Sequence, residues 1–374
     1  MHKAINEKTL RAALAERGWT QSLLAKDLGV SSQSITNWMK GADFPRPATL
    51  LRLATTLRLT FDELVKIEDE GKPIVAFRKK AGAKTTAQHI SKAMGIGMLL
   101  KPLVPYLPQV QALRTVITSP STDYPKLQAA ALQTRSRLGI GDQAVLSYEH
   151  LIGEFKNCGA VLVPVLWGAK GNHENALHIR LPQEDVTFVF LNLDTRLEDF
   201  KFWMAHELAH VFTPELAGKE EGEDFADAFA GALLFPKACA EQACREIAHA
   251  RSTDAVLKVF CRWSQEHMIS LNTVYQQVKR FANDSGLPLP GIDERAIHAT
   301  RNVISGPLIS AVLFDPAPPD ANLYIAAAEH AFQSDFFIAL RQMVKDQGTG
   351  PSYVQQILES PMQDAFAMHR VLSH

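Results

Sequence analysis

Residues 206–210 read H-E-L-A-H, which places two histidines four positions apart with a glutamate between them. On an α-helix, positions four apart lie on the same face, about 6 Å apart along the axis. Two imidazoles in that arrangement, His206 and His210, can bind one zinc ion through bonds of roughly 2.0–2.1 Å. The intervening Glu207 can reach a water molecule on the ion and accept its proton. The motif therefore predicts a metal site with its own general base.

The residues around the motif predict the helix that it requires. Thr195 and Glu198 fit the capping-box pattern S/T-x-x-E, which starts a helix at about residue 195. Pro214 ends the helix, because proline cannot continue the backbone hydrogen bonds. Between these limits apolar side chains recur at helical spacing, at Leu197, Phe200, Met204, Leu208 and Val211. We expect the motif to lie in a buried helix.

A second stretch, residues 223–236, reads as a buried helix of small and apolar residues that stops at a proline. An acidic side chain in its first turn needs a partner, and we predict that Glu223 supplies the third metal ligand. Asp227 lies one turn later, where it can accept an N–H bond from a ligand histidine. The competing interpretation is an ordinary buried histidine pair. Rival carboxylates precede the helix and rank lower: Glu215, Glu220 and Glu221.

The two motifs, H-E-L-A-H and then E-x-x-A-x-x-F-A-x-x-L-L-x-P, resemble the ImmA/IrrE-type zinc metallopeptidases over about residues 125–285. The resemblance implies that His206, His210 and Glu223 bind Zn²⁺ and that Glu207 is the general base. Mn²⁺ or Fe²⁺ stay open, since two histidines and one carboxylate suit several metals. Where the family often has asparagine four residues after the glutamate ligand, this chain has aspartate, similar to the E-x-x-x-D arrangement of other zinc peptidases.

The first seventy residues show a separate helical pattern. Two short helices are expected at residues 20–28 and 32–40, joined by a Gly-Val-Ser turn, with three further apolar-faced helices around them. The pattern resembles the XRE-type (lambda-repressor-like) helix-turn-helix domain. The resemblance implies double-stranded operator DNA as a partner and a homodimer on two half-sites. We predict DNA contacts at Gln21, Ser31, Ser32, Gln33, Ser34, Asn37 and Lys40.

The residue types on the second of these helices suit DNA. Glutamine can pair with adenine in the major groove, and serine and lysine suit phosphates. Residues 1–66 hold ten Lys/Arg against six Asp/Glu, a modest positive excess. The alternative is an ordinary polar helix face. The basic run F-R-K-K at residues 77–80 is interpreted as solvated rather than as a further DNA contact.

Short Val-rich runs predict a small sheet before the H-E-x-x-H helix. These strands are expected at residues 160–166, 176–181 and 186–191. In a zinc peptidase fold, an edge strand beside the metal can hold an extended peptide through backbone bonds. Asn192, at the end of the last strand, is a candidate substrate contact. His173 and His178 are interpreted as polar surface residues.

Composition limits the class of protein. The 374 residues carry a formal net charge of −1, so no overall field draws the chain to nucleic acid. No signal-peptide pattern opens the sequence, and no apolar run reaches the roughly 20 residues of a membrane span. The four cysteines form no C-x-x-C pair and are expected to be reduced: Cys158, Cys239, Cys244 and Cys261. We therefore expect a soluble, cytoplasmic protein with no membrane partner.

The expected fold class is mainly α with a small β-sheet (α+β). An all-α helix-turn-helix head is followed by a zincin-like metallopeptidase domain and a C-terminal mixed or helical tail. The expected segments are a DNA-binding domain at 1–70, a helical connector at 71–124, a metallopeptidase domain at 125–285 and a domain of unknown role at 286–374.

These features together predict a DNA-binding transcriptional regulator with a zinc-dependent endopeptidase domain. By family resemblance, its substrate is a repressor-type protein, either a partner or this chain itself, and cleavage switches on mobile-element or stress-response genes. Two alternatives remain open. One is a non-enzymatic DNA-binding repressor that uses the metallopeptidase fold as a scaffold or sensor, and the other is an antitoxin-like partner of a neighbouring gene product.

Overall fold

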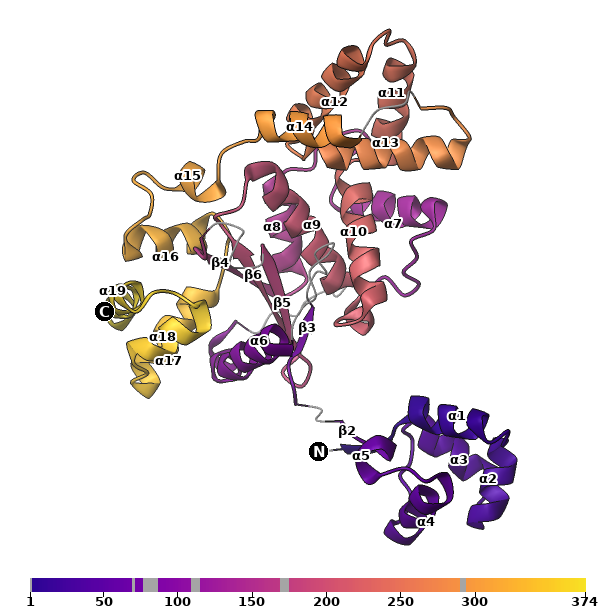
Figure 1. Cartoon of the computed structure of the whole chain (residues 1–374). Helices are drawn as coiled ribbons and strands as arrows, with labels where there is room; N and C mark the ends of the chain where they lie inside the picture. The colour runs from indigo at the N-terminus through magenta and orange to yellow at the C-terminus, as the bar shows by residue number, and fades with distance from the viewer. Residues whose placement is uncertain (1, 69–70, 77–86, 109–114, 169–174, 290–293) are drawn as a thin grey trace. The chain divides into compact units, whose positions relative to one another are not determined.

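The computed structural model describes residues 2–68, 71–76, 87–108, 115–168, 175–289 and 294–374 (Figure 1). Backbone contacts divide the chain into two compact units, residues 1–72 and residues 73–374. Each unit has its own hydrophobic core. The basic run at 77–80 and His173 lie outside the described residues.

The first unit is a helical head with a two-stranded sheet. Its elements are β1 (His2–Ile5), α1 (Glu7–Glu16), α2 (Gln21–Leu28), α3 (Ser32–Met39), α4 (Pro47–Leu57), α5 (Phe61–Leu64) and β2 (Val65–Glu68). The five predicted helices are present. The sequence did not predict the antiparallel pair β1–β2. It joins the two ends of the unit through four-residue strands, which leave little local pattern.

Capping residues define the helix-turn-helix in this head. Thr20 begins α2 by accepting the backbone N–H of Leu23 at 3.2 Å. Gly29 ends it in the left-handed conformation, with φ +68°, which glycine adopts without steric cost. Ser31 then begins α3 by accepting the N–H of Ser34 at 3.0 Å. The fully buried core behind these caps comprises Leu10, Leu24, Ile35, Leu53 and Leu64.

The second unit is built around a mixed four-stranded sheet in the order β3-β5-β6-β4 (Figure 1). Its strands are β3 (Ile74–Ala76), β4 (Ala160–Val165), β5 (Ala176–Leu181) and β6 (Val186–Asn192). Strands β5 and β6 are antiparallel, β4 runs parallel to β6, and β3 runs antiparallel to β5. The three predicted strands are confirmed to within one residue. The sequence did not predict β3, which is only three residues long.

Helices cover the sheet, with α8 and α9 on one side and α6 with the C-terminal helices on the other (Figure 1). The helices up to the second zinc-motif helix are α6 (Ala87–Leu100), η1 (Lys101–Tyr106), α7 (Tyr124–Arg137), α8 (Tyr148–Asn157), α9 (Leu197–Phe212), η2 (Pro214–Leu216) and α10 (Glu220–Leu234). Those that follow are α11 (Lys237–Ala248), α12 (Thr253–His267), α13 (Leu271–Ser285), α14 (Glu294–Ile304), α15 (Ile309–Leu313), α16 (Ala321–His330), α17 (Phe336–Gln347), α18 (Pro351–Leu358) and α19 (Met362–Ser373). The predicted α+β class is confirmed.

Helix α9 starts without the predicted capping box. Its first helical residue is Leu197, and no side chain caps the helix. The carboxylate of Glu198 accepts the N–H of Gly306 at 3.2 Å instead of turning back to Thr195. The N–H of Leu197 donates to the carbonyl of Pro307 at 3.0 Å. A distant segment therefore satisfies the helix start, which a local sequence pattern cannot show.

The C-terminal helices pack against strand β4 and share its core. The hydroxyl of Tyr324 donates to the Pro164 carbonyl at 2.5 Å, and the hydroxyl of Ser334 donates to the Leu162 carbonyl. These bonds satisfy backbone groups on the outer side of β4, which is an edge strand. Segments 71–124, 125–285 and 286–374 thus contribute to one compact unit, and their boundaries stay predictions.

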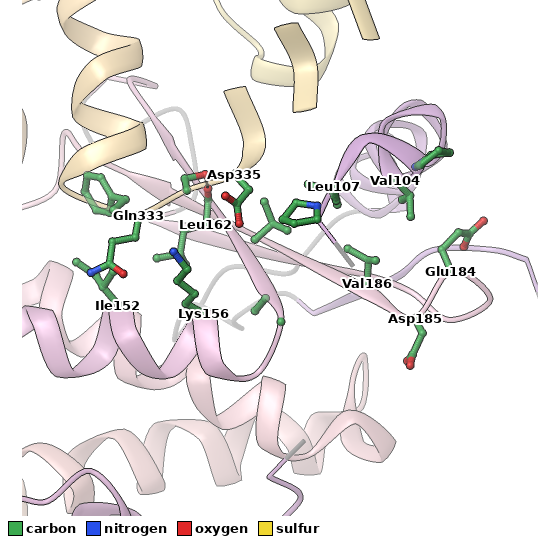
Figure 2. Close-up of a pocket in the computed structure, with 17 residues that line it drawn as sticks. Val104, Leu107, Ile152, Lys156, Leu162, Glu184, Asp185, Val186, Gln333 and Asp335 are labelled. Carbon is green, nitrogen blue, oxygen red and sulfur yellow. Dashed lines mark hydrogen bonds between the residues drawn. The ribbon is translucent and has the colours of Figure 1, made fainter. Parts of the chain in front are cut away.

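A pocket of about 450 Å³ lies beside this same edge (Figure 2). Apolar side chains such as Leu107, Ile152 and Leu162 line it together with Lys156 and Asp335. The residues predicted to bind metal or DNA are not among those that line this pocket. Among the described residues, no helix is long and apolar enough to span a lipid bilayer.

Candidate metal centre and DNA-reading face

Helix α9 brings both histidines of the H-E-x-x-H motif to one buried point. The Nε2 atoms of His206 and His210 lie 3.1 Å apart. Helix α10 packs along α9 and carries Glu223 in its first turn. The carboxylate of Glu223 lies 3.4 Å from Nε2 of His206 and 3.2 Å from Nε2 of His210. The structure therefore brings the three predicted ligands together.

The spacing of these donor atoms fits a tetrahedral metal ion. Bonds of roughly 2.0–2.1 Å place neighbouring ligand atoms of a tetrahedral zinc ion about 3.3–3.4 Å apart, close to the three separations above. All the donor atoms lie within 4.8 Å of one another. Both carboxylate oxygens of Glu223 are buried and accept no hydrogen bond from the described residues. Two imidazole nitrogens and one free carboxylate form a donor set that suits Zn²⁺.

The rival carboxylates lie apart from this cluster. We expected Glu220 and Glu221 to precede the second helix, but they are the first two residues of α10. Their side chains, like that of Glu215, are exposed to solvent. Exposure, rather than a position before the helix, separates them from the buried donors.

Asp227 contacts the first histidine from its other side. Its Oδ1 lies 2.9 Å from Nδ1 of His206. When Nδ1 donates this bond, the neutral imidazole presents the lone pair of Nε2 to the cluster. Trp203, one turn earlier on α9, packs edge-on against the same imidazole with ring centroids 5.6 Å apart. The orientation of His206 is therefore fixed from two sides.

The interpretation of His178 as a surface residue was wrong. Its ring is buried on β5 and packs against the ring of His210, with centroids 5.5 Å apart. Its Nδ1 lies 3.5 Å from Oε2 of Glu207. Side chains alternate along a strand, so His178 projects to the face of β5 that Leu177 and Ile179 do not share. This pattern predicted a solvent-facing histidine. Helix α9 covers that face as well, so the polar face is buried.

Burial sets the protonation of the groups around the cluster. It raises the pKa of Glu207 and lowers the pKa of His178 to about 3, so His178 is neutral. Burial also favours the protonated form of Glu223, but the adjacent imidazoles of His206 and His210 outweigh this effect and lower the pKa of that carboxyl to about 2. An ionised Glu223 suits metal binding, and a raised pKa brings Glu207 toward the range useful to a general base.

In the head, helix α3 carries most of the predicted DNA contacts. The amide of Gln33 donates to Oδ1 of Asn37 at 2.8 Å, which joins the two side chains on one face. Gln21 accepts the hydroxyl of Thr36 at 3.4 Å and so links α2 to α3. The exposed members of the predicted set are Ser31, Ser32, Gln33 and Lys40, and the half-buried members are Gln21, Ser34 and Asn37.

Two further expectations concern Asn192 and the cysteines. The side chain of Asn192 is buried and already bonded, accepting from the N–H groups of Trp167 and Asp194 and donating to Gly168. The side chain of Asn192 therefore stabilises the end of β6 and is not exposed to a substrate in this structure. The four cysteines are free, as expected, and burial raises the pKa of Cys239 to about 12.

Comparisons with known proteins agree with both parts. Residues 10–64 match the family model described as Helix-turn-helix, and residues 169–279 match that of the IrrE N-terminal-like domain, which belongs to a peptidase family. The second match includes the predicted metal cluster, and the first includes the predicted DNA contacts on and beside α3. The searches of curated proteins and of solved structures returned no match. The chain therefore joins an XRE-type helix-turn-helix domain to an IrrE-type domain of a metallopeptidase family.

Proposed function

We propose that this protein is a DNA-binding regulator whose second unit is a zinc-dependent endopeptidase. The observation that carries the proposal is the cluster of His206, His210 and Glu223, with Glu207 between the histidines. A buried donor set of this kind with an adjacent carboxylate is the arrangement that metal-assisted hydrolysis requires. We further propose that the substrate is a repressor-type protein, either a partner or a second copy of this chain.

In this proposal, His206, His210 and Glu223 hold the ion, with Zn²⁺ favoured over Mn²⁺ or Fe²⁺. When bound, the ion supplies Lewis acidity, which activates water and polarises a carbonyl group. Glu207 accepts a proton from the attacking water and delivers it to the leaving amine. Asp227 acts through His206 as a positioning residue, because its hydrogen bond to Nδ1 fixes the tautomer of that imidazole.

For the head, we propose double-stranded operator DNA as the partner. Gln33 and Asn37 present amides that can read base edges, and Ser32 and Lys40 suit phosphates. Exposure of the tip of α3 supports this assignment. A homodimer would place two such helices on two half-sites. The proposed domains are residues 1–70 for DNA, 71–124 as connector, 125–285 for the peptidase and 286–374 as a tail.

The Glu207→Gln variant tests the proposed chemistry. Purified protein is mixed with repressors encoded by neighbouring genes and with itself, and products are identified by mass spectrometry. We expect zinc content to persist and cleavage to fall by about 10²–10⁴-fold, the usual contribution of a positioned general base. Glu215→Gln, an exposed acid in the segment between α9 and α10, serves as the matched control. Cleavage by Glu207→Gln at the wild-type rate would rule out the mechanism.

One observation favours the non-enzymatic alternative, in which the metal fold is a sensor. The predicted metal residues are almost inaccessible, with exposures of 1% for His206 and His210 and 8% for Glu223. A sensor needs no route for a peptide. The same experiment separates the two functions, because a sensor would bind zinc, cleave nothing, and change its DNA affinity when zinc is removed.

A further inference from the structure

Strand β3 occupies the outer edge of β5. Its three residues pair antiparallel with that strand, with Ile74 opposite Arg180, Val75 opposite Ile179 and Ala76 opposite His178. β3 thus takes one of the two edge positions of the sheet, and β4 takes the other. The chain reaches this position directly from the boundary at residue 72 that separates the two units.

The edge that β3 covers belongs to the strand nearest the predicted metal cluster. His178 on β5 lies 3.5 Å from Glu207 and packs against His210. Directly paired residues of an antiparallel pair project to the same face of the sheet. Ala76 therefore projects to the face on which His178 meets the cluster. A peptide paired with β5 at this register would place a side chain over the same residues.

β3 is enclosed from both faces. On the metal side, the loop between α9 and α10 passes over it, and a Cβ added to Gly218 would lie 3.3 Å from the Val75 carbonyl oxygen. On the opposite side, α6 packs against β3, and a Cβ on Gly97 would lie 2.5 Å from the side chain of Pro73, the residue just before that strand. Val75 and Ala76 are buried as a result. In this arrangement β3 fills the edge of β5, and the predicted metal ligands are shielded from solvent.

A zinc peptidase fold holds its peptide at a strand edge beside the metal; we propose that in this protein β3 is an internal occupant of that edge, the outer edge of β5, and that an extended substrate displaces it. The inference rests on the proposed peptidase function. Extended peptides bind exposed sheet edges through main-chain hydrogen bonds, and β3 shows that this edge accepts an antiparallel strand.

The distance to Glu207 favours a peptide that displaces β3 over a peptide that pairs with the outer edge of β3. Neighbouring strands lie about 4.8 Å apart, so a peptide beyond β3 would lie about 10 Å from β5. A general base must lie within hydrogen-bond reach of the reacting water, or one water away. Glu207 is in contact with a side chain of β5 itself. Only a peptide in the position of β3 comes next to that strand.

The occupant also indicates which peptides fit. Ala76, the residue opposite His178, is buried with an exposure of 3%. A larger side chain at that position would collide with the residues packed on the face of the sheet that carries His178. The preferred substrate is therefore an extended segment with a small residue, such as alanine, glycine or serine, opposite His178.

A reversible disulfide between β3 and β5 tests this inference. Ile74 and Arg180 are directly paired and both half-buried. Opposed residues of an antiparallel pair have Cα atoms roughly 4.5–5.5 Å apart, within the range that a disulfide spans. The full-length protein with Ile74→Cys and Arg180→Cys is compared in its oxidised and reduced forms. Each single-cysteine variant serves as a control for the substitution itself.

Two measurements read the opening of β3 without relying on peptidase activity. The first is the rate at which zinc-loaded protein loses zinc to excess EDTA. The second is hydrogen exchange at the amides of β5, which follows local opening and needs no metal. We expect the oxidised form to be at least about tenfold slower in both, with the reduced form returning to the wild-type rate.

The outcomes separate this inference from the proposed function. Equal rates in the oxidised and reduced forms would overturn the inference and make β3 a permanent strand of the sheet. If the disulfide slows zinc loss and hydrogen exchange but neither form cleaves any repressor, the proposed peptidase function is wrong, and β3 still opens from the edge of β5. If the protein binds no zinc at all, the metal function fails and hydrogen exchange alone decides whether β3 opens.

Discussion

The helix-turn-helix head and the metal cluster present their functional side chains in opposite ways. Ser32 and Gln33 on α3 and Lys40 at its C-terminal end are exposed and can meet a ligand without any change in the fold. On α9, His206 and His210 are buried under β5, α10 and their loops, with exposures of 1%. The predicted DNA contacts therefore lie at a surface, whereas the predicted metal ligands do not.

The difference is consistent with the function proposed for each site. Base reading needs hydrogen-bonding groups at a protruding surface, because the major groove surrounds the helix. Metal-assisted hydrolysis needs metal ligands and a general base held together away from bulk water, which strengthens their electrostatic interactions. A buried site must therefore open to take a macromolecule, whereas the DNA-reading face needs no such step. The proposed displacement of β3 would be that opening.

The largest effect on the exposed side of the comparison is expected from Gln33→Ala combined with Asn37→Ala. The two amides are bonded to each other and act as one unit, so a single change would leave part of the contact. We expect about 100-fold weaker binding, since each good base contact contributes roughly 1–3 kcal/mol. The measurement is fluorescence anisotropy with operator DNA selected from a random pool.

The control for this pair is Thr55→Ala, an exposed threonine on α4. Zinc content should stay at the wild-type level in all three proteins if the head and the metal cluster work independently. Unchanged DNA affinity in the double variant would show that Gln33 and Asn37 on α3 do not contact the DNA bases.

On the buried side, Asp227→Ala is expected to weaken zinc affinity by about 10–100-fold, because the hydrogen bond that orients His206 is lost. Competition with a chromophoric chelator measures the affinity. Asp227→Asn should recover part of it, since an amide oxygen still accepts the Nδ1 hydrogen. Asp224→Ala, an exposed residue in the same helix, is the matched control. Equal weakening by Asp224→Ala would mean that the effect is only loss of negative charge.

A smaller effect is expected at Lys201, a buried charge on α9 outside the cluster. Its Nζ donates to the His267 carbonyl at 2.7 Å, and burial lowers its pKa to about 8. Since the unfolded side chain titrates near 10.4, the unfolded state binds more protons between pH 8 and 10.4, and stability rises with pH in that window. From pH 7.5 to 9.5 the gain should be about 2 kcal/mol.

Urea unfolding of the wild type and of Lys201→Met at these two pH values measures that gain. The wild type should gain stability relative to Lys201→Met, and it should gain none relative to Lys237→Met, an exposed control. An identical pH response in the wild type and Lys201→Met would show that the buried lysine is not the source.

Local patterns predicted the elements whose signals lie within one segment. The helix of the H-E-x-x-H motif and the buried second helix with Glu223 follow from apolar spacing, and the helices on either side of Gly29 follow from their caps. Strands β4, β5 and β6 were also predictable, because each is a run of six or seven apolar-rich residues.

The remaining features depend on contacts between distant segments. The start of α9 is satisfied by Pro307, far along the chain, instead of by a local cap. The position of His178 next to Glu207 depends on α9 covering the polar face of β5. Strand β3 is three residues long and gains its place only by pairing with β5. None of these contacts leaves a periodic signal in its own segment.

The central claim is that His206, His210 and Glu223 bind a metal ion, and metal content tests it most directly. Wild type, His206→Ala and the exposed control His249→Ala are purified without added metal and measured by inductively coupled plasma mass spectrometry. We predict about one zinc ion per chain in the wild type and in His249→Ala, and loss of that ion in His206→Ala. Folded wild-type protein that contains no metal and takes up none on addition of zinc would contradict the account.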